Sequence, residues 1–454
     1  MFSAKGSSLS ILILSLASYI TVNHLFAPRV HKINENVWWG VGPEQNNDTE
    51  IREFNINVPE EVITDLKWRL KHHRPFRPSI GTANQYGTNS IFLDEFIDHW
   101  ENHYNWTERE IFLNKYPQFK TRIQGLDIHF IHIKPDTDEN KKVLPMLMVH
   151  GWPGSVREFY DVVDILTNNI NRNYTLELVI PSLPGFGFSE ATTKPGLSLA
   201  HTAVLFKKLM NRLGHEKFYL QGGDLGGITL QILSALYPES VLGYHTNFPV
   251  VYTLKSYIKP ILGVLYPSWI VKPEHYERVY PLKDRGLFIF RESGYFHLQS
   301  TKPDSLGVAM DNSPEGMAAY FLEKFITGSN FTYINKFSSK DLKEKFSFTG
   351  LIDNLMLYWV TQTASSSFRM YFESFEDGFW TDSIALMSTP LSVRTAIFRS
   401  KYDLYMADGV LNEIFTNNIQ LNDYDASHFP AFEIPQTFSD DLLNAVDKFE
   451  AEQI

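Results

Sequence analysis

The residue types best suited to catalysis meet at a glycine-rich turn, GGDLGG, over residues 222–227. An apolar, strand-like segment precedes the turn and a helical pattern begins near Ile228, so Asp224 falls between a strand and a helix. A tight turn that presents a nucleophile needs small residues two places before and after it, and Gly222 and Gly226 stand there. A phosphate-binding loop would have similar glycines, but the Asp224 carboxylate would repel a phosphate.

A carboxylate at such a turn can attack an sp³ carbon that bears a leaving group, and this forms an ester on the enzyme itself. Water must then attack the aspartyl carbonyl, and backbone N–H groups must stabilise the oxyanion that develops there. Leu225 follows the nucleophile and would supply one N–H. Trp152 would supply the other, because the HGWP sequence from His150 to Pro153 comes directly after an apolar strand at 144–149.

Hydrolysis of that ester needs a base that activates water, and His428 is the best placed of the chain's 15 histidines. In hydrolases whose nucleophile sits at such a turn, the chain order can be nucleophile, acid and then histidine. His428 lies near the C-terminus, in a loop after the last strand-like segment. The orienting acid should follow a predicted strand at 395–398, where Asp403 is the first choice and Asp408 the alternative. The acid would hold the imidazole tautomer and stabilise the imidazolium.

From about residue 143 the sequence alternates between apolar strands and helical segments. Strands are predicted at 144–149, 176–180, 218–220 and 395–398, and a helix is predicted at 440–449. This alternation predicts a doubly wound, mostly parallel α/β sheet, whose active site lies at the carboxyl ends of the strands. The residues singled out above fall at such ends.

The chain divides into five predicted parts. Helical patterns at 59–70 and 93–100 and a hairpin turn at 123–126 precede the α/β unit. From about 248 to 380 the alternation lapses into an aromatic-rich stretch, which we interpret as a helical cap inserted into the core; some of its rings should line a pocket. The predicted parts are a membrane anchor at 1–28, an N-terminal extension at 29–140, the first part of the core at 141–247, the cap at 248–385 and the second part of the core at 386–454.

An apolar run from Leu9 to Phe26 predicts the membrane anchor, since its 18 residues approach the ~20 that span a bilayer core. No clear small-x-small cleavage site follows, which favours a retained anchor over a removed signal peptide. Arg29, His31 and Lys32 follow the run and Lys5 precedes it, so the rest of the chain should face the cytosol. Four N-glycosylation sequons would instead suit a lumenal domain: Asn47, Asn105, Asn173 and Asn330.

Composition narrows the function further. Lys and Arg number 41 against 52 Asp and Glu, and the formal net charge of −11 argues against a nucleic-acid partner, which would need a basic surface. The chain has no cysteine, which excludes a disulfide framework, a thiolate metal site and a cysteine nucleophile. The ester chemistry described above needs no metal and no organic cofactor.

Several separate motifs resemble the microsomal epoxide hydrolases, including the insect juvenile hormone epoxide hydrolases. The resemblance covers nearly the whole chain and implies an α/β-hydrolase fold with a helical cap and a place in the endoplasmic reticulum membrane. The motifs are HGWPGS at 150–155, SLPGFGFSE at 182–190, QGGDLGG at 221–227, ESGYFHLQSTKPDS at 292–305 and SHFPAFEIP at 427–435.

The resemblance also implies two cap tyrosines that hydrogen-bond an epoxide oxygen, and the motifs place them at Tyr295 and Tyr371. A phenol can donate a proton to the developing alkoxide without carrying a charge. The implied reaction converts a lipophilic epoxide, either xenobiotic or like juvenile hormone, to a vicinal diol. One residue departs from the family pattern: Leu225 stands where Trp is usual, which puts the pocket wall and substrate preference in doubt.

Two other functions fit parts of the pattern. Haloalkane dehalogenases share the fold and the aspartate nucleophile but hold halide with indole N–H groups, which Leu225 cannot supply. A catalytically silent paralogue that binds an apolar ligand would show a broken triad, whereas Asp224, His428 and a candidate acid are all present. The aspartate at the apex of the turn excludes a serine esterase.

Overall fold

The computed structural model describes residues 33–44, 48–81, 83–136, 141–168, 171–376 and 381–451. The predicted anchor at Leu9 to Phe26 and the sequon at Asn47 lie outside these ranges. Within them, no helix combines the length and the hydropathy that crossing a bilayer requires.

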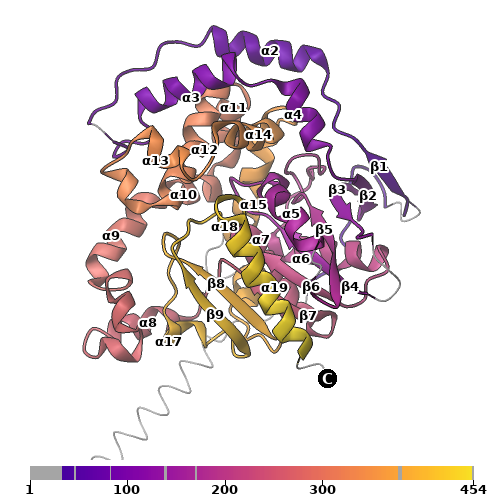
Figure 1. Ribbon diagram of the computed structural model, residues 1–454, viewed down its shortest axis with the longest axis vertical. Helices are drawn as coiled ribbons and strands as arrows, with labels where there is room; N and C mark the ends of the chain where they lie inside the picture. Colours follow the sequence, from indigo (N-terminus) through magenta and orange to yellow (C-terminus); the bar gives the residue numbers. More distant parts are fainter. Residues whose placement is uncertain are drawn as a thin grey trace, which may run out of the picture.

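A nine-stranded sheet forms the centre of the molecule, in the order β1-β2-β3-β5-β4-β6-β7-β8-β9 (Figure 1). The first three strands and β5 pair antiparallel, and the pairs from β5 through β4 to β9 are parallel. This confirms the predicted mostly parallel sheet. The strands are β1 (Ile51–Phe54), β2 (Gln118–Ile123), β3 (Leu126–Ile133), β4 (Lys142–Val149), β5 (Tyr174–Pro181), β6 (Phe218–Gly222), β7 (Val241–Thr246), β8 (Thr395–Ser400) and β9 (Asn418–Tyr424).

Helices cover both faces of the sheet because its central strands are apolar along their length. Every residue of β5, β6 and β8 is buried, as expected for parallel strands packed on two sides. In Figure 1, α5 and α19 lie on the near face and α6 and α7 on the far face. The helices of these layers are α5 (Tyr160–Thr167), α6 (Leu199–Arg212), α7 (Asp224–Leu236) and α19 (Pro435–Ala451). Two short helices, α17 (Asp408–Leu411) and α18 (Pro430–Glu433), precede α19 in the chain.

The chain between β7 and β8 is helical and forms the cap, as predicted. It contains α8 (Leu254–Leu262), α9 (Leu282–Glu292), α10 (Gly294–Thr301), α11 (Pro303–Asp311), α12 (Pro314–Ser329), α13 (Ser339–Lys343), α14 (Phe348–Trp359), α15 (Ala364–Phe375) and α16 (Asp382–Met387). The extension upstream of the core contributes α2 (Glu60–Lys71), α3 (Ser90–Asn102) and α4 (Trp106–Leu113).

The N-terminal extension supplies β1, β2 and β3 to the sheet, whereas its helices α2 and α3 pack on the cap and lie above α12 and α14 in Figure 1. A buried carboxylate joins the two parts. Asp353 of α14 is fully buried and accepts hydrogen bonds from the Tyr104 hydroxyl at 2.9 Å and from Arg109 at 2.6 and 2.9 Å. Arg157, in the core, donates to the same carboxylate at 3.2 Å. Extension, cap and core therefore meet at one charged group.

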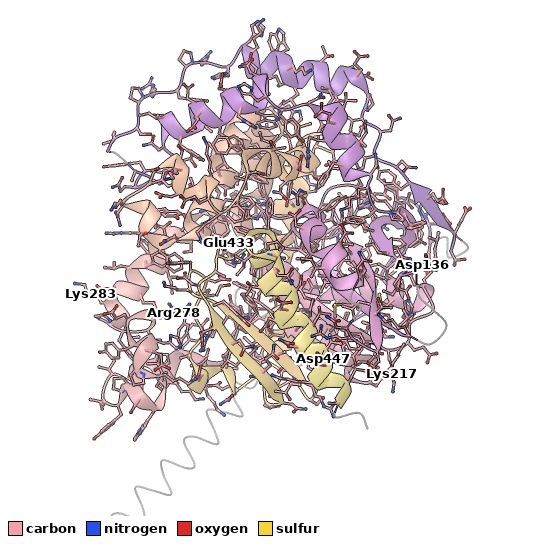
Figure 2. All side chains as sticks on the ribbon, in the orientation of Figure 1. Asp136, Lys217, Arg278, Lys283, Glu433 and Asp447 are labelled. Carbon is pink, nitrogen blue, oxygen red and sulfur yellow. The ribbon has the colours of Figure 1, made fainter. Side chains whose placement is uncertain are left out.

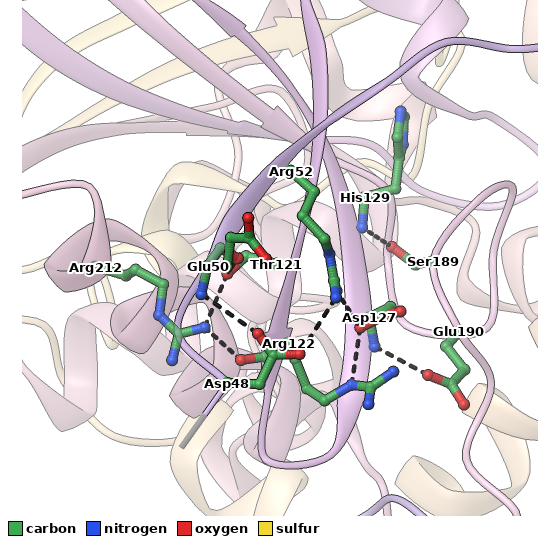
Figure 3. A network of polar contacts seen from close by, with 10 residues as sticks. All are labelled: Asp48, Glu50, Arg52, Thr121, Arg122, Asp127, His129, Ser189, Glu190 and Arg212. Carbon is green, nitrogen blue, oxygen red and sulfur yellow. Dashed lines mark hydrogen bonds and ion pairs between the residues drawn. The ribbon is translucent and has the colours of Figure 1, made fainter. Parts of the chain in front are cut away.

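A second polar network connects the three strands at the antiparallel edge of the sheet (Figure 3). Arg52 of β1 and Arg122 of β2 both donate to Asp127 of β3, at 2.8 and 2.9 Å. The backbone N–H of Asp127 donates to the Glu190 side chain at 3.0 Å. These side chains are partly exposed, so the ion pairs add little stability but favour one register of the strands.

Most elements predicted from periodicity are present, including the hairpin turn, which joins β2 to β3 with Gln124 and Gly125 at positive φ. Two details differ. The first is β7, a strand that the alternation of strands and helices did not reveal. Its sequence VLGYHT mixes polar and apolar residues because Thr246 and His245 are buried with polar partners. The helix after the turn begins at Asp224 rather than near Ile228, since glycines that weaken a helix pattern are here part of its first turn.

Candidate active site

Asp224 stands at a bend that only glycine neighbours allow. It begins α7 directly after β6 and has a φ of +49°, a left-handed conformation that costs energy for a residue with a side chain. A Cβ on Gly222 would lie 2.9 Å from the carbonyl carbon of Gly226. A Cβ on Gly226 would collide with the carbonyl oxygen of Val149 in β4. The predicted spacing of small residues is therefore a packing requirement of this bend.

A backbone donor from the HGWP segment reaches the Asp224 carboxylate. The N–H of Trp152 donates to Asp224 Oδ1 at 2.9 Å, and a side chain on Gly151 would collide with Asp224. Leu225 is buried in the first turn of α7, where its N–H has no acceptor within the helix. One predicted oxyanion donor, the Trp152 N–H, is thus hydrogen-bonded to the carboxylate, and the other belongs to the residue that follows Asp224.

His150 and Pro153 belong to the loop that carries Trp152. His150 Nδ1 contacts the Gly151 carbonyl oxygen at 2.9 Å, and its Nε2 accepts a hydrogen bond from the Leu183 N–H at 3.2 Å. Burial lowers the pKa of His150 to about 4, so the ring is neutral and serves both contacts at once. The peptide bond before Pro153 is cis. The loop is therefore held by its own side chain and by a neighbouring segment.

His428 lies between two carboxylates. Its Nε2 is 3.5 Å from Asp224 Oδ2, and its Nδ1 is 2.9 Å from Asp403 Oδ1. Asp408, the alternative acid, instead pairs with Arg399 and with Lys272. The three side chains of Asp224, His428 and Asp403 therefore form one contiguous set, and the geometry favours Asp403 over Asp408 as the partner of His428.

The charges around His428 determine its protonation. Burial by itself lowers the pKa of His428, but the negative charges and hydrogen bonds of Asp403 and Asp224 outweigh it and raise the pKa well above 6.5. The side chains of His428 and Asp224 are each 15% exposed, so water screens this attraction weakly. At neutral pH the set is an imidazolium flanked by carboxylates.

Two cap helices bring Tyr295 and Tyr371 over the same place. The Trp152 ring stacks on Tyr295 at 5.4 Å between centroids and meets Tyr371 edge-on at 6.0 Å. The two tyrosine rings are 6.3 Å apart. Burial and the negative charge of Asp224 raise the pKa of both phenols above 10. Both hydroxyls therefore keep their protons at neutral pH, and the predicted pair is together in the structure.

Sequence reasoning missed one carboxyl group close to this set. Glu158, on a short 3₁₀ helix (Val156–Phe159), is buried, and its Oε2 would be 3.0 Å from a Cβ built on Gly154 of the Trp152 loop. Burial raises the pKa of Glu158 to about 8, with opposing effects from the charges of His428 and Asp224. Its only sequence signal was its nearness to the HGWPGS motif, because an isolated Glu does not reveal its burial.

Among the described residues, one group of His and acidic side chains has ligand atoms close enough to bind a metal ion: His132, Glu177 and His215. The Nε2 atoms of the two imidazoles lie 2.6 and 3.1 Å from the same Glu177 oxygen. Burial raises the pKa of Glu177, but these hydrogen bonds outweigh it and lower the pKa to about 2. The group lies where β3, β5 and the end of α6 meet and shares no residue with the Asp224 set.

Comparison with known proteins agrees with this geometry. The family model described as "Epoxide hydrolase N terminus" matches residues 51–159, and the one described as "alpha/beta hydrolase fold" matches residues 145–257. The chain is 44% identical to juvenile hormone epoxide hydrolase 2 of Ctenocephalides felis, over 91% of this chain and 89% of that protein. It is 38% identical to epoxide hydrolase 1 of Sus scrofa, over 89% and 91% of the two chains.

Solved structures show the same similarity. The crystal structure of juvenile hormone epoxide hydrolase from Bombyx mori superimposes with a TM-score of 0.87 at 39% identity, covering 93% of this chain and all of that one. An epoxide hydrolase from Aspergillus niger, at 22% identity and a TM-score of 0.70, shares the fold over 88% of this chain and 97% of its own. These relationships place the chain with the epoxide hydrolases and not with the haloalkane dehalogenases. The chain belongs to the epoxide hydrolase family that includes the microsomal and juvenile hormone enzymes, and it is an epoxide hydrolase.

Proposed function

We propose that Asp224 opens the epoxide by attacking one of its ring carbons, which forms an ester between substrate and enzyme. The observation that carries this proposal is the placement of the Asp224 carboxylate, between the Trp152 N–H at 2.9 Å and His428 at 3.5 Å. Tyr295 and Tyr371 lie across the Trp152 ring and would donate hydrogen bonds to the epoxide oxygen as its C–O bond breaks.

The charge of Asp224 links ester formation, the first step, to hydrolysis of the ester, the second. While Asp224 is ionised, it helps to keep His428 protonated, as the raised pKa indicates. Forming the ester removes that negative charge, so the pKa of His428 falls and its proton passes through solvent to the alkoxide of the opened epoxide. The neutral imidazole can then accept a proton. Asp403 remains at Nδ1, 2.9 Å away, and stabilises the imidazolium that forms when His428 takes a proton from water.

The second step is attack of that water on the aspartyl carbonyl. The new oxyanion would lie on the former Asp224 oxygen and accept hydrogen bonds from the N–H groups of Trp152 and Leu225. Collapse of the intermediate breaks the bond to the substrate oxygen, which takes the proton from His428, so that the product leaves as a vicinal diol. The carboxylic acid left at Asp224 returns its proton to His428, which regenerates the starting state. The Leu225 donor is a backbone group, so the usual Trp side chain at this position is not required for the chemistry.

Trapping the ester tests the mechanism. We expect His428→Gln, mixed with an epoxide such as styrene oxide, to gain the mass of the epoxide on the peptide that contains Asp224. Asp224→Asn is the matched control and should gain no mass. Absence of an adduct in His428→Gln, together with loss of turnover, would rule out a stable aspartyl ester; an adduct at another residue would identify a different nucleophile.

We further propose that the substrates are lipophilic epoxides, with a terpenoid of the juvenile hormone type favoured over xenobiotic arene oxides. Juvenile hormone epoxide hydrolases of two insects are 44% and 40% identical to this chain, against 38% for epoxide hydrolase 1 of the pig. Competition between a juvenile hormone and styrene oxide in one reaction tests this. A higher kcat/KM for styrene oxide would reverse the preference.

The apolar run at 9–26 and the basic residues after it support a further proposal, that the protein is a single-pass protein of the endoplasmic reticulum membrane with its catalytic part in the cytosol. Asn105 and Asn173 are exposed sequons in the described residues. In insect cells they should stay unmodified, and protease added to intact microsomes should digest the catalytic part. An endoglycosidase-sensitive mass shift would place this part in the lumen instead.

A further inference from the structure

Exposed hydrophobic side chains gather on one part of the cap. More than half of the large hydrophobic residues that are exposed in the described chain fall within residues 254–290, here called the α8–α9 surface. Leu265 is 77% exposed and Trp269 74%. Scattered exposed hydrophobics are normal, but a contiguous set of this kind marks a surface that something covers.

The helices of this surface are amphipathic, and some of their side chains contact the rest of the protein: Leu282 packs against the hydrophobic core and the Phe288 ring meets Phe331. Neither α8 nor α9 buries a single residue. The surface is nevertheless held in place: Lys259 of α8 forms an ion pair with Glu413 at 2.8 Å, and the Tyr280 hydroxyl donates to the Pro260 carbonyl at 2.9 Å. It is therefore a fixed feature of the cap, and the hydrophobic side chains on its outer side remain exposed.

The residue types of the segment indicate what covers it. Residues 254–290 contain six lysines and arginines against three acidic residues. Three of the basic residues, Lys259, Lys272 and Arg278, pair with acidic residues outside the segment. Lys283 lies at the outer edge of the molecule on α9 (Figure 2). Apolar residues with Trp, Tyr and basic side chains around them are typical of a membrane interface.

We propose that the α8–α9 surface docks onto the headgroup region of a membrane that contains anionic lipids. The nine residues of α8 are far shorter than the ~20 needed to cross a bilayer, so the helix would lie along the interface. The surface is separate from the predicted anchor at 9–26, which would only tether the protein near the bilayer. The inference does not rest on the proposed catalytic mechanism.

The absence of cysteine allows a direct test with the full chain. Leu265→Cys and, as a second position, Trp269→Cys would each carry an environment-sensitive NBD label. Ile91→Cys is the matched control, since Ile91 is 81% exposed on α3, at the far end of the molecule from α8 in Figure 1. A thermal melt of each labelled protein would confirm that the fold is intact.

In vesicles of phosphatidylcholine and phosphatidylserine, we expect the labels at 265 and 269 to shift to shorter wavelength and to be quenched severalfold by nitroxide lipids. The label at 91 should remain in water. Labels at 265 and 269 that stay in water on vesicle-bound protein would overturn the proposal. Shielding of these labels from water in the absence of vesicles would also overturn it. Shielding that grew with protein concentration would indicate contact with a second copy of the chain, and shielding independent of concentration would indicate contact with a segment of the same chain.

The basic residues provide a second test. We would make Lys283→Glu in the Leu265→Cys protein and measure the ratio of quenched to unquenched label. The substitution should lower this ratio roughly fivefold in vesicles that contain phosphatidylserine and should change it little in vesicles of phosphatidylcholine alone. Lys217→Glu reverses an exposed lysine on the opposite side of the molecule (Figure 2) and should leave the ratio unchanged. Equal effects of the two substitutions would exclude a specific electrostatic contact at this surface.

Discussion

The two nitrogens of His428 face different carboxylates, and this division separates their roles. Asp403 contacts Nδ1 at 2.9 Å, whereas Asp224 lies 3.5 Å from Nε2, the nitrogen that must receive a proton from water. We expect Asp403→Asn to slow hydrolysis of the ester by about 10³-fold or more, because the imidazolium loses its counter-charge. Asp408→Asn is the control and should retain normal hydrolysis. Single-turnover decay of the ester distinguishes them; equal slowing would show that both carboxylates support His428.

The tyrosine pair should act on the first step alone. Removing one hydroxyl with Tyr295→Phe or Tyr371→Phe should slow ester formation by about a hundredfold, since one proton donor to the alkoxide is lost while the ring remains. Tyr320→Phe is the matched control, because its ring also contacts Trp152 but no role is proposed for its hydroxyl. Rapid-quench measurement of ester formation tests this. Unchanged rates in both variants would remove the tyrosines from the mechanism.

Glu158 should make stability depend on pH. Its pKa in the folded protein is about 8, against an ordinary value of 4.5. Between these values the unfolded chain has lost a proton that the folded chain keeps, so the free energy of unfolding decreases as pH rises from about 4.5 to 8. Glu158→Gln removes this contribution, so its stability relative to the parent should increase across that window. Urea denaturation at several pH values measures it, and parallel curves would contradict it.

At the scale of single elements, the bend between β6 and α7 depends on the absence of a side chain. Gly226→Ala would drive a Cβ into the Val149 carbonyl and should cost about 3 kcal/mol or more, with loss of activity. Gly286→Ala is the control: nothing lies within 4 Å of its added Cβ, and in the helix α9 it should stabilise by about 0.5–1 kcal/mol. Chemical denaturation compares them. A stable, active Gly226→Ala enzyme would show that the bend tolerates a Cβ.

At the scale of the whole molecule, Asp353 links three parts that are distant in sequence. Asp353→Asn removes a buried charge that pairs with Arg109 and Arg157. We expect a loss of about 3–5 kcal/mol, because Arg109 would lose its carboxylate partner and the buried Arg157 would keep only Asp161. Asp304→Asn breaks the more exposed pair with Arg369 and should cost at most about 1 kcal/mol. Equal unfolding midpoints for the two variants would show that the Asp353 cluster adds no net stability.

The mostly parallel sheet, the bend and its glycine neighbours could be predicted from the sequence because each depends on local patterns. Gly222 and Gly226 are required by the bend around Asp224, and apolar runs identify most of the buried strands. The strand β7 escaped detection because its polar residues have buried partners supplied by other elements. The anchor at 9–26 and the domain boundaries remain predictions.

The amino-acid sequence predicts the available chemistry: a carboxylate at a glycine bend, a histidine late in the chain and a family resemblance that the comparisons confirm. Distinguishing Asp403 from Asp408 required the folded protein, since both follow β8 and packing brings one of them to His428. Tertiary packing alone buried Glu158 beside the site and left the α8–α9 surface uncovered. Burial and exposure depend on contacts between segments far apart in the chain, and no local pattern encodes them.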